Sequence, residues 1–292
     1  DLQRLINSSL NLMTDRTEYV FSSVYTDEAA PGSNNGGQGI TGDYIFVMNV
    51  ANGSANAIWT SNYAALARIN RVIEAADRIV PVDAADAEVI ERSKAEALVL
   101  RAICHLKIMS YYSTNPKDDS ALAGVLADRV ISTAETPSRA TNGAFYTSIH
   151  QDLNDAISIY DANTAPAYAA ASRTFYPSKV LAQAMKARAF ALKGDYPNAE
   201  IFADAVINTS GISLATTEAQ YNSVFHGHNE AANTEVIFRL RRTAQQNGQG
   251  TNLHNGWVSV GNRRNGSPFY EVSRALFNQY APGFNPGVDF ND

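Results

Sequence analysis

Residues 176–208 contain the feature that most limits how this chain can fold, two helix-forming segments separated by a short break. The first segment, 176–194, is rich in alanine, which has the highest helix propensity and lets a neighbouring helix approach closely. The break supplies Gly194, suited to a left-handed helix end, and then Asp195, suited to cap the next helix. Apolar residues then recur at helical spacing: Ala199, Phe202, Ala203, Val206 and Ile207. The pattern predicts an antiparallel helical hairpin over 178–208, about the length of one tetratricopeptide unit.

Other segments show the same helical periodicity, so the fold class is predicted to be mainly α. These segments are 1–14, 56–79, 86–113 and 144–161. The segment 86–113 has two apolar stripes, one that includes Leu98 and one that includes Cys104. Two stripes on one helix indicate neighbours on two sides. His105 lies within the first stripe, where we expect a hydrogen-bonded core histidine.

Two segments are too rich in glycine and asparagine to form helices, 26–44 and 243–268. Loops of this length are usually functional or disordered. Near the second one, the segment 233–242 has a short strand-like core, and 271–280 is predicted to form a final short helix. The sequence therefore combines a helical middle with loop-rich regions on either side of it.

Bulk properties exclude several classes of protein. The net charge is −6, whereas nucleic acids and acidic membrane surfaces attract concentrated positive charge. A single cysteine cannot form an internal disulfide. The chain contains no apolar run near the roughly 20 residues that a membrane-spanning helix needs. It begins without the basic and apolar regions of a signal peptide, so we expect that none exists or that it has been removed.

The motifs for catalysis, cofactors and metals are weak. The segment "GQGITG" (37–42) has the glycine spacing of a dinucleotide site but lacks the preceding strand and following helix. The segment "FHGHNE" (225–230) offers two histidines without a further cluster of ligands. No Gly-x-Ser-x-Gly motif occurs, and Asp118 and Asp119 are expected to be solvated loop residues. We therefore expect no enzyme activity, no cofactor and no metal.

Between residues 56 and 280, the chain contains five sequence blocks that match the pattern of one protein family in order and spacing. The first three are "IWTSNYAALARINRVIE", "AEALVLRAICHLKIMSYY" and "SRATNGAFYTSIHQDLNDAI". The other two are "SKVLAQAMKARAFALKGDYPNAEIFADAVI" and "TEVIFRL". The set resembles the SusD/RagB family of outer-membrane nutrient-binding lipoproteins. The residues that match the family pattern in the first three blocks are Trp59, Tyr63, Ile69, Asn70, Glu96, Ala97, Leu100, Arg101, Ala102, Arg139, Tyr146, Ile149, Asp152, Leu153 and Ala156.

The resemblance implies a mainly α fold of tetratricopeptide-like helix pairs in a right-handed superhelix, with loop-rich insertions. It implies a cell-surface lipoprotein that captures oligosaccharides and passes them to a SusC-like TonB-dependent outer-membrane transporter. Residues 1–292 would form one SusD-like domain that lacks a C-terminal segment and the lipid-bearing N-terminal cysteine. Residues 56–208 would be the helical scaffold, and 15–55 with 209–292 the loop-rich ligand side.

Sugar binding requires aromatic faces for the apolar sides of the rings and polar side chains for the hydroxyl groups. The segments 25–44 and 243–270 supply both types. The candidate ligand-binding residues are Tyr25, Asp27, Asn35, Tyr44, Asn255, Trp257, Arg263 and Tyr270. Trp257 is the best single candidate because it lies outside any helical stripe, whereas Trp59 sits in a helix and is expected to pack in the core.

Two other functions stay open at this level. A cytoplasmic tetratricopeptide scaffold would bind a protein partner, but it predicts several clean repeats of about 34 residues, and only one convincing unit is visible. A glycan-active enzyme would need two carboxylates at a defined separation across a cleft, which a sequence does not show. The lack of catalytic motifs favours a binding protein.

Overall fold

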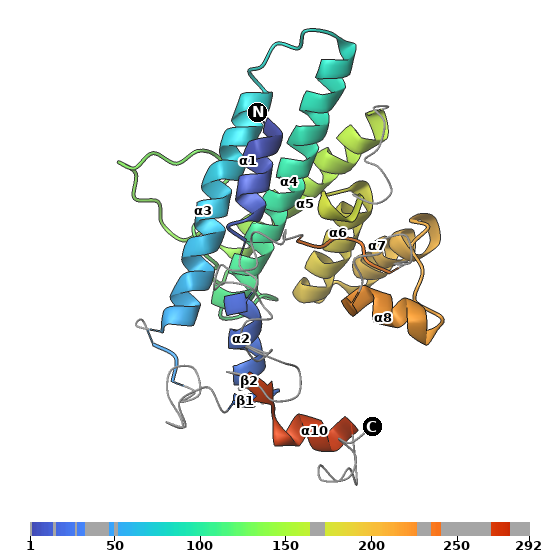
Figure 1. Cartoon of the computed structure of the whole chain (residues 1–292). Helices are drawn as coiled ribbons and strands as arrows, with labels where there is room; N and C mark the ends of the chain where they lie inside the picture. Colours follow the sequence, from blue (N-terminus) through green and yellow to red (C-terminus); the bar gives the residue numbers. More distant parts are fainter. Residues whose placement is uncertain are drawn as a thin grey trace. The chain divides into compact units, whose positions relative to one another are not determined.

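The computed structural model describes residues 2–13, 16–26, 28–32, 47–49, 52–163, 173–226, 235–240 and 270–280. These residues are mainly helical, as predicted (Figure 1). The helices are α1 (Leu2–Leu10), α2 (Arg16–Tyr25), α3 (Gly53–Ala76), α4 (Ala84–Tyr112), α5 (Asn142–Ala162), α6 (Lys179–Lys193), α7 (Tyr196–Thr209), α8 (Glu218–His226) and α10 (Arg274–Tyr280). The strands are β1 (Ala29–Pro31) and β2 (Tyr270–Val272), and a short 3-10 helix covers Arg173–Phe175.

The chain divides into two compact units. The first contains residues 1–13 and 62–241, and the second contains residues 14–61 and 242–292. The first unit therefore holds α1, most of α3 and the helices from α4 to α8, while the second holds α2, both strands, the first turns of α3 and α10. Both segments predicted to carry ligand residues belong to the second unit.

Helix α4 forms the core of the first unit. It contacts α1, α5 and α6, so it is covered on more than one side. Side chains from both predicted stripes are buried, including Leu98, Leu100 and Cys104. Burying a leucine side chain contributes about 1.5–3 kcal/mol, which explains why a helix with two stripes is held between neighbours. The prediction of contacts on two sides is confirmed.

The predicted hairpin is formed by α6 and α7. Gly194 has φ +87°, the left-handed conformation expected at a helix end, and the side chain of Asp195 accepts a bond from the Asn198 N–H. Ala182 and Ala189 are fully buried, and α6 packs against both α5 and α7. Small side chains on α6 thus allow the close helix approach that the sequence predicted.

Aromatic rings connect α5, α6 and α7. The rings of His150 and Phe190 stack with centroids 4.1 Å apart, and those of Phe190 and Phe202 lie 5.7 Å apart. Burial, with nearby Lys186 as a second cause, lowers the pKa of His150 to about 4, so the ring packs as a neutral aromatic group. The predicted stripe along α7 is only partly covered, since Ile207 is 69% exposed.

The second unit contains a two-stranded antiparallel sheet. Ala29 pairs with Val272, and Pro31 pairs with Tyr270. The N–H of Ser273 extends the ribbon by donating to the Glu28 carbonyl over 2.9 Å. Strand β1 also contacts α2, which belongs to the same unit.

Near the C-terminus, one element prediction is wrong, and another is confirmed with a later start. Residues 235–240, expected to be part of a strand, form no strand, and the Arg239 N–H instead donates to the Thr174 carbonyl over 2.8 Å. The helix expected over 271–280 begins only at Arg274, because the preceding residues pair with β1. Ser273 caps this helix, its hydroxyl oxygen accepting the Leu276 N–H over 3.1 Å.

Candidate ligand-binding site

The β1–β2 pair brings together residues of both predicted ligand segments. The chain leaves β1 after Pro31 and enters β2 at Tyr270, and these two residues are direct partners in the ladder (Figure 1). In an antiparallel pair, the end of one strand lies beside the start of the other. The segments 25–44 and 243–270, about 200 residues apart in sequence, are therefore joined at one end of a ribbon.

Tyr25 is the candidate ligand residue whose side chain the structure describes. It ends α2, is half-buried, and its ring lies 4.6 Å from that of Phe21 at a tilt of 36°. Its hydroxyl accepts a long bond of 3.5 Å from the side-chain amide of Asn52. Asn52 also caps the start of α3, because its amide oxygen accepts the Ala55 N–H over 2.8 Å. Tyr25 is thus held at one edge by a neighbouring ring and at its hydroxyl by a helix cap.

The structure describes less of the other candidate ligand residues. Tyr270 lies in β2, where its backbone pairs with Pro31. The remaining candidates lie outside the described residues: Asp27, Asn35, Tyr44, Asn255, Trp257 and Arg263. Sequence reasoning missed Asn52, although an asparagine directly before a long helix is an N-cap signal that could have drawn attention to it.

A buried polar network fills the centre of the first unit. The guanidinium of Arg101 donates from Nε and Nη2 to the two carboxylate oxygens of Asp152, over 2.9 and 2.6 Å. Its Nη1 donates to the Asn70 amide oxygen over 3.1 Å and to the Asp128 carbonyl over 2.6 Å. The Asn70 amide nitrogen donates to the Ala127 carbonyl over 2.8 Å. Three residues from three helices, each part of a recognised sequence block, therefore converge on one loop.

Burial shifts the pKa values of two groups at this network, Asp152 and His105. Desolvation raises the pKa of Asp152, while the bonds from Arg101 oppose that shift. Burial, together with the positive charge of Arg101, lowers the pKa of His105 to about 3. The neutral His105 ring accepts the Ala127 N–H at Nε2 over 3.3 Å, which confirms the predicted hydrogen-bonded core histidine.

Stability should fall in acid because of His105. Its folded pKa lies below the ordinary value of 6.5, so the unfolded chain binds the extra proton between pH 6.5 and about 3. Stability is therefore fully present above pH 6.5 and is lost as the pH falls, by at most about 1.4 kcal/mol per pH unit. Urea unfolding of the parent and of His105→Gln across this range measures the difference. Parallel stability curves for the two proteins would contradict the assignment.

Three further side chains fasten the same loop, residues 113–141, between α4 and α5. The Tyr63 hydroxyl accepts the Val125 N–H over 2.7 Å and donates to the Val125 carbonyl over 2.9 Å. Arg139 Nη2 donates to the carbonyls of Tyr112 and Leu122, over 2.9 and 3.0 Å. Tyr146 donates its hydroxyl to the Pro116 carbonyl over 3.0 Å. These bonds hold a long irregular connection in one conformation.

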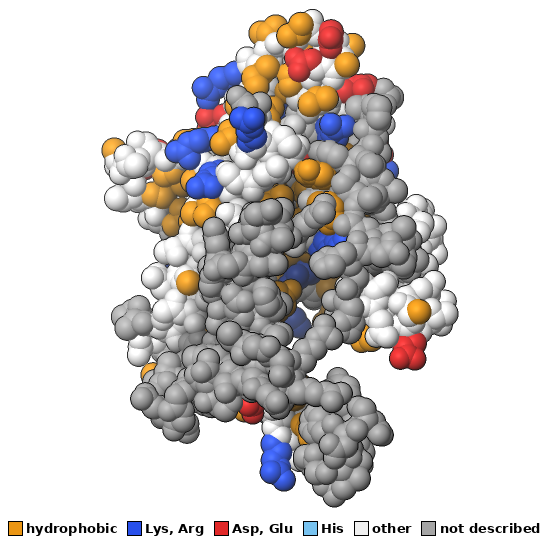
Figure 2. Space-filling view, viewed as in Figure 1, with side chains coloured by type: hydrophobic (Ala, Val, Ile, Leu, Met, Phe, Trp, Pro, Cys, Tyr) orange, Lys and Arg blue, Asp and Glu red, His pale blue; other side chains and the backbone are white. Residues whose placement is uncertain are grey.

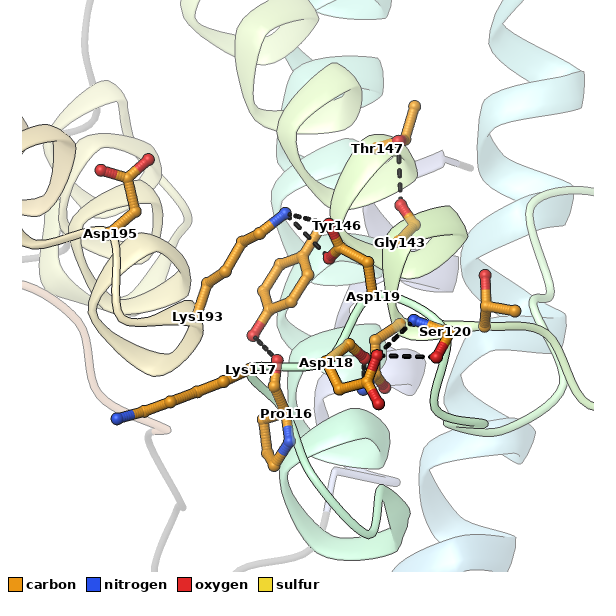
Figure 3. Close-up of polar contacts among 12 residues, drawn as sticks. Pro116, Lys117, Asp118, Asp119, Ser120, Gly143, Tyr146, Thr147, Lys193 and Asp195 are labelled. Carbon is orange, nitrogen blue, oxygen red and sulfur yellow. Dashed lines mark hydrogen bonds and ion pairs between the residues drawn. The ribbon is translucent and has the colours of Figure 1, made fainter.

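Two adjacent aspartates of this loop, Asp118 and Asp119, also form bonds that stabilise it (Figure 3). Asp118 accepts the N–H and the hydroxyl of Ser120 over 2.9 and 2.7 Å, and these bonds lower its pKa. Asp119 pairs with Lys193 of α6 at 2.8 Å, and the Lys193 ammonium lies over the Tyr146 ring at 5.1 Å. Asp118 thus stabilises the loop locally, whereas Asp119 links the loop to α6.

The described residues contain no group of three or more histidine, cysteine or acidic side chains that could hold a metal ion. Across the same residues, none of the helices is both long enough and apolar enough to cross a membrane. The region "FHGHNE" has His226 at the end of α8, and His228 and Glu230 lie outside the described residues, as does "GQGITG".

Comparison with known families decides the classification. Residues 1–190 match the SusD-like family model described as starch-binding and associating with the outer membrane. The chain belongs to the SusD-like family. The buried network of Asn70, Arg101 and Asp152 lies within the matched residues, as do the loop-fastening residues Tyr63 and Arg139.

Solved structures share the fold of this SusD-like chain. A SusD superfamily protein from Bacteroides thetaiotaomicron is 18% identical with a TM-score of 0.73, covering 96% of this chain and 61% of the other. A SusD-like carbohydrate binding protein from Bacteroides vulgatus is 20% identical with a TM-score of 0.69, covering 89% and 54%. A laminarin binding SusD-like protein is 20% identical with a TM-score of 0.60, covering 77% and 48%. The SusD-like chain thus spans about three fifths or less of these proteins, and no curated protein matches it.

Proposed function

We propose that this SusD-like chain is a cell-surface binding protein that captures oligosaccharides and passes them to a SusC-like TonB-dependent outer-membrane transporter. The observation that carries the proposal is the family match over residues 1–190, whose description is starch-binding and associating with the outer membrane. Two of the similar structures are described as carbohydrate binding and laminarin binding proteins, which supports a glycan as the class of ligand.

The ligand side is proposed to be the second unit. The β1–β2 pairing supports this, because it joins the segments 25–44 and 243–270 at one end of a ribbon. Aromatic rings from these segments would stack on the apolar faces of sugar rings, while their Asn, Asp and Arg groups would bond the hydroxyls. Tyr25, with its hydroxyl bonded to Asn52, offers one such ring.

The helical unit is proposed to act as the scaffold of the protein. Its buried network and fastened loop provide a rigid body, and sites that bind ligands are commonly loops supported by such a body. The sequence-based division, with the scaffold over 56–208 and the ligand side over 15–55 and 209–292, differs from these units in residues 56–61 and 209–241, which belong to the second and the first unit. Capture involves no bond making or breaking, so no catalytic group is assigned, and a lipid at the native N-terminus would hold the protein at the cell surface.

Replacing Trp257 with alanine should weaken glycan binding at least about tenfold, or about 1.4 kcal/mol, if the ring is a stacking platform. Calorimetric titration with starch-type and laminarin-type glucans would measure the dissociation constants. Tyr196→Ala is the matched control, because this tyrosine is 62% exposed at the start of α7 in the scaffold. Binding that is unaffected by Trp257→Ala would refute the site, and a panel in which no glycan binds would refute the ligand class.

A further inference from the structure

The turn between α3 and α4, residues 77–83, exposes apolar side chains to an unusual degree. Val80 is 85% exposed and Val82 is 91% exposed, and Ile79 and Pro81 beside them are also exposed. Figure 2 shows apolar side chains and carboxylates next to one another at the top of the view, where Figure 1 places this turn. Single exposed apolar residues are ordinary, whereas four in succession are the kind of contiguous apolar surface that contacts with other molecules use.

The turn is held in one conformation by its own hydrogen bonds. The last turn of α3 closes when the Ile79 N–H donates to the Ala75 carbonyl over 3.0 Å. The N-cap of α4 is reciprocal: Asp83 accepts the Asp86 N–H over 2.8 Å, and Asp86 accepts the Val82 N–H over 2.9 Å. Because the backbone is already ordered, burying the turn against a partner would cost little conformational entropy.

The surroundings of the turn are acidic. Residues 74–94 contain six carboxylates and three cations. Two of the cations are already paired within this region, Arg78 with Glu74 at 2.6 Å and Lys94 with Asp77 at 2.5 Å. Asp83 and Asp86 therefore add negative charge directly beside the exposed valines, and a complementary surface would carry lysine or arginine around an apolar centre.

This combination favours a protein over a lipid surface. Segments that enter membranes carry lysine, arginine, tryptophan or tyrosine at the interface, and residues 77–83 have one arginine, which is paired, and no aromatic residue. Negative charge would also be repelled by acidic headgroups. A shallow apolar pocket with a basic rim on a protein matches both the valines and the carboxylates.

We propose that the α3–α4 turn is a docking site for a partner protein. Val80 and Val82 enter an apolar pocket of that protein, and Asp83 and Asp86 face the basic residues around the pocket. The turn belongs to the first unit, whereas the proposed glycan segments belong to the second, so this contact does not depend on the glycan proposal. An experiment can therefore contradict the glycan proposal without contradicting the docking proposal, and the reverse.

The test begins with Val82→Cys in the full chain, labelled with a photoreactive benzophenone. Labelling is selective because the only natural cysteine, Cys104, is buried. The labelled protein is illuminated with membranes and extract of the organism that makes it. Ile207→Cys is the matched control, since it places the same label on an exposed apolar position of α7. The expected result is one crosslinked protein at position 82 that is absent at position 207.

The captured protein is then purified and its dissociation constant is measured. Val80→Ser with Val82→Ser should weaken binding at least tenfold, while the melting temperature stays unchanged because both side chains are exposed. Asp83→Asn keeps the helix cap but removes a charge, so it should weaken binding a few-fold at low salt and little at high salt. A crosslink to lipid, to a second copy of this chain or to nothing would overturn the proposal. An affinity insensitive to the valine variants would overturn it as well.

Discussion

Replacing Arg101 with methionine is expected to lower the free energy of unfolding by about 3–5 kcal/mol, because it leaves a buried carboxylate without its cation. Asp152 is buried and receives two bonds from this guanidinium. Asn70 and the Asp128 carbonyl each lose a donor at the same time. Urea unfolding followed by circular dichroism measures the loss, which would exceed that of most single substitutions.

The pH dependence of that loss identifies its cause. Desolvation already raises the pKa of Asp152, and removing Arg101 should raise it further above its unfolded value. A raised folded pKa means that the folded state gains protons, so the penalty should be largest at neutral pH and should shrink as the pH falls. A deficit independent of pH would indicate lost packing rather than an uncompensated charge.

Two companion variants complete the experiment. Arg101→Met with Asp152→Leu removes both charges, and well-packed apolar replacements of a buried pair are often nearly neutral, so most of the stability should return. Arg129→Met breaks the exposed pair between Arg129 and Glu135, which lies at 2.6 Å, and should change the stability little because solvent screens both charges. Equal losses in Arg101→Met and Arg129→Met would contradict the role given to burial.

Gly124→Ala is expected to destabilise the protein by about 1–3 kcal/mol, because the added methyl group has no space. Its Cβ would lie 2.5 Å from Ile108 Cγ2 and 2.7 Å from the Tyr63 hydroxyl oxygen. Ile108 is fully buried in α4, and the Tyr63 hydroxyl is fixed by two bonds to Val125. Neither neighbour can move without breaking packing or the hydrogen bonds that fasten the loop.

Gly53→Ala is the matched control for that substitution. The added Cβ would meet nothing within 4 Å at this first residue of α3, so thermal unfolding should shift little or upward. For Gly124→Ala the melting temperature should drop, and hydrogen exchange should rise in residues 113–141. An unchanged melting temperature for Gly124→Ala would show that the loop does not approach α4 closely in solution.

The long helices could be predicted because their signals are local. The apolar period of 56–79 and 86–113 marks α3 and α4, and Gly194 with Asp195 marks the turn of the hairpin. Helices α2 and α8 were missed, and both are short, with 10 and 9 residues. Short helices depend on tertiary contacts for stability, so their sequences carry weaker signals.

The strands show the opposite case. Residues 235–240 have strand-like composition but no partner strand in the described part of the chain, whereas Tyr270–Val272 pairs with Ala29–Pro31. A strand exists only when its backbone groups find a ladder, and that partner is more than 200 residues away. Composition alone therefore predicted a strand in the wrong segment. Tyr270 was chosen as a ligand candidate, but the sequence did not show that it pairs with Pro31 in a β-ladder.

The sequence by itself determined that this is a mainly α chain with a capped helical hairpin, and its ordered blocks indicated the SusD-like family, because period, caps and block order are all local properties. It placed Asn70, Arg101 and Asp152 within those blocks but could not say what they do. Only the tertiary structure decided that they form one buried network on the loop between α4 and α5. It also decided that β1 and β2 join the two predicted ligand segments. Contacts between distant residues depend on how whole helices pack, and no local pattern encodes that geometry.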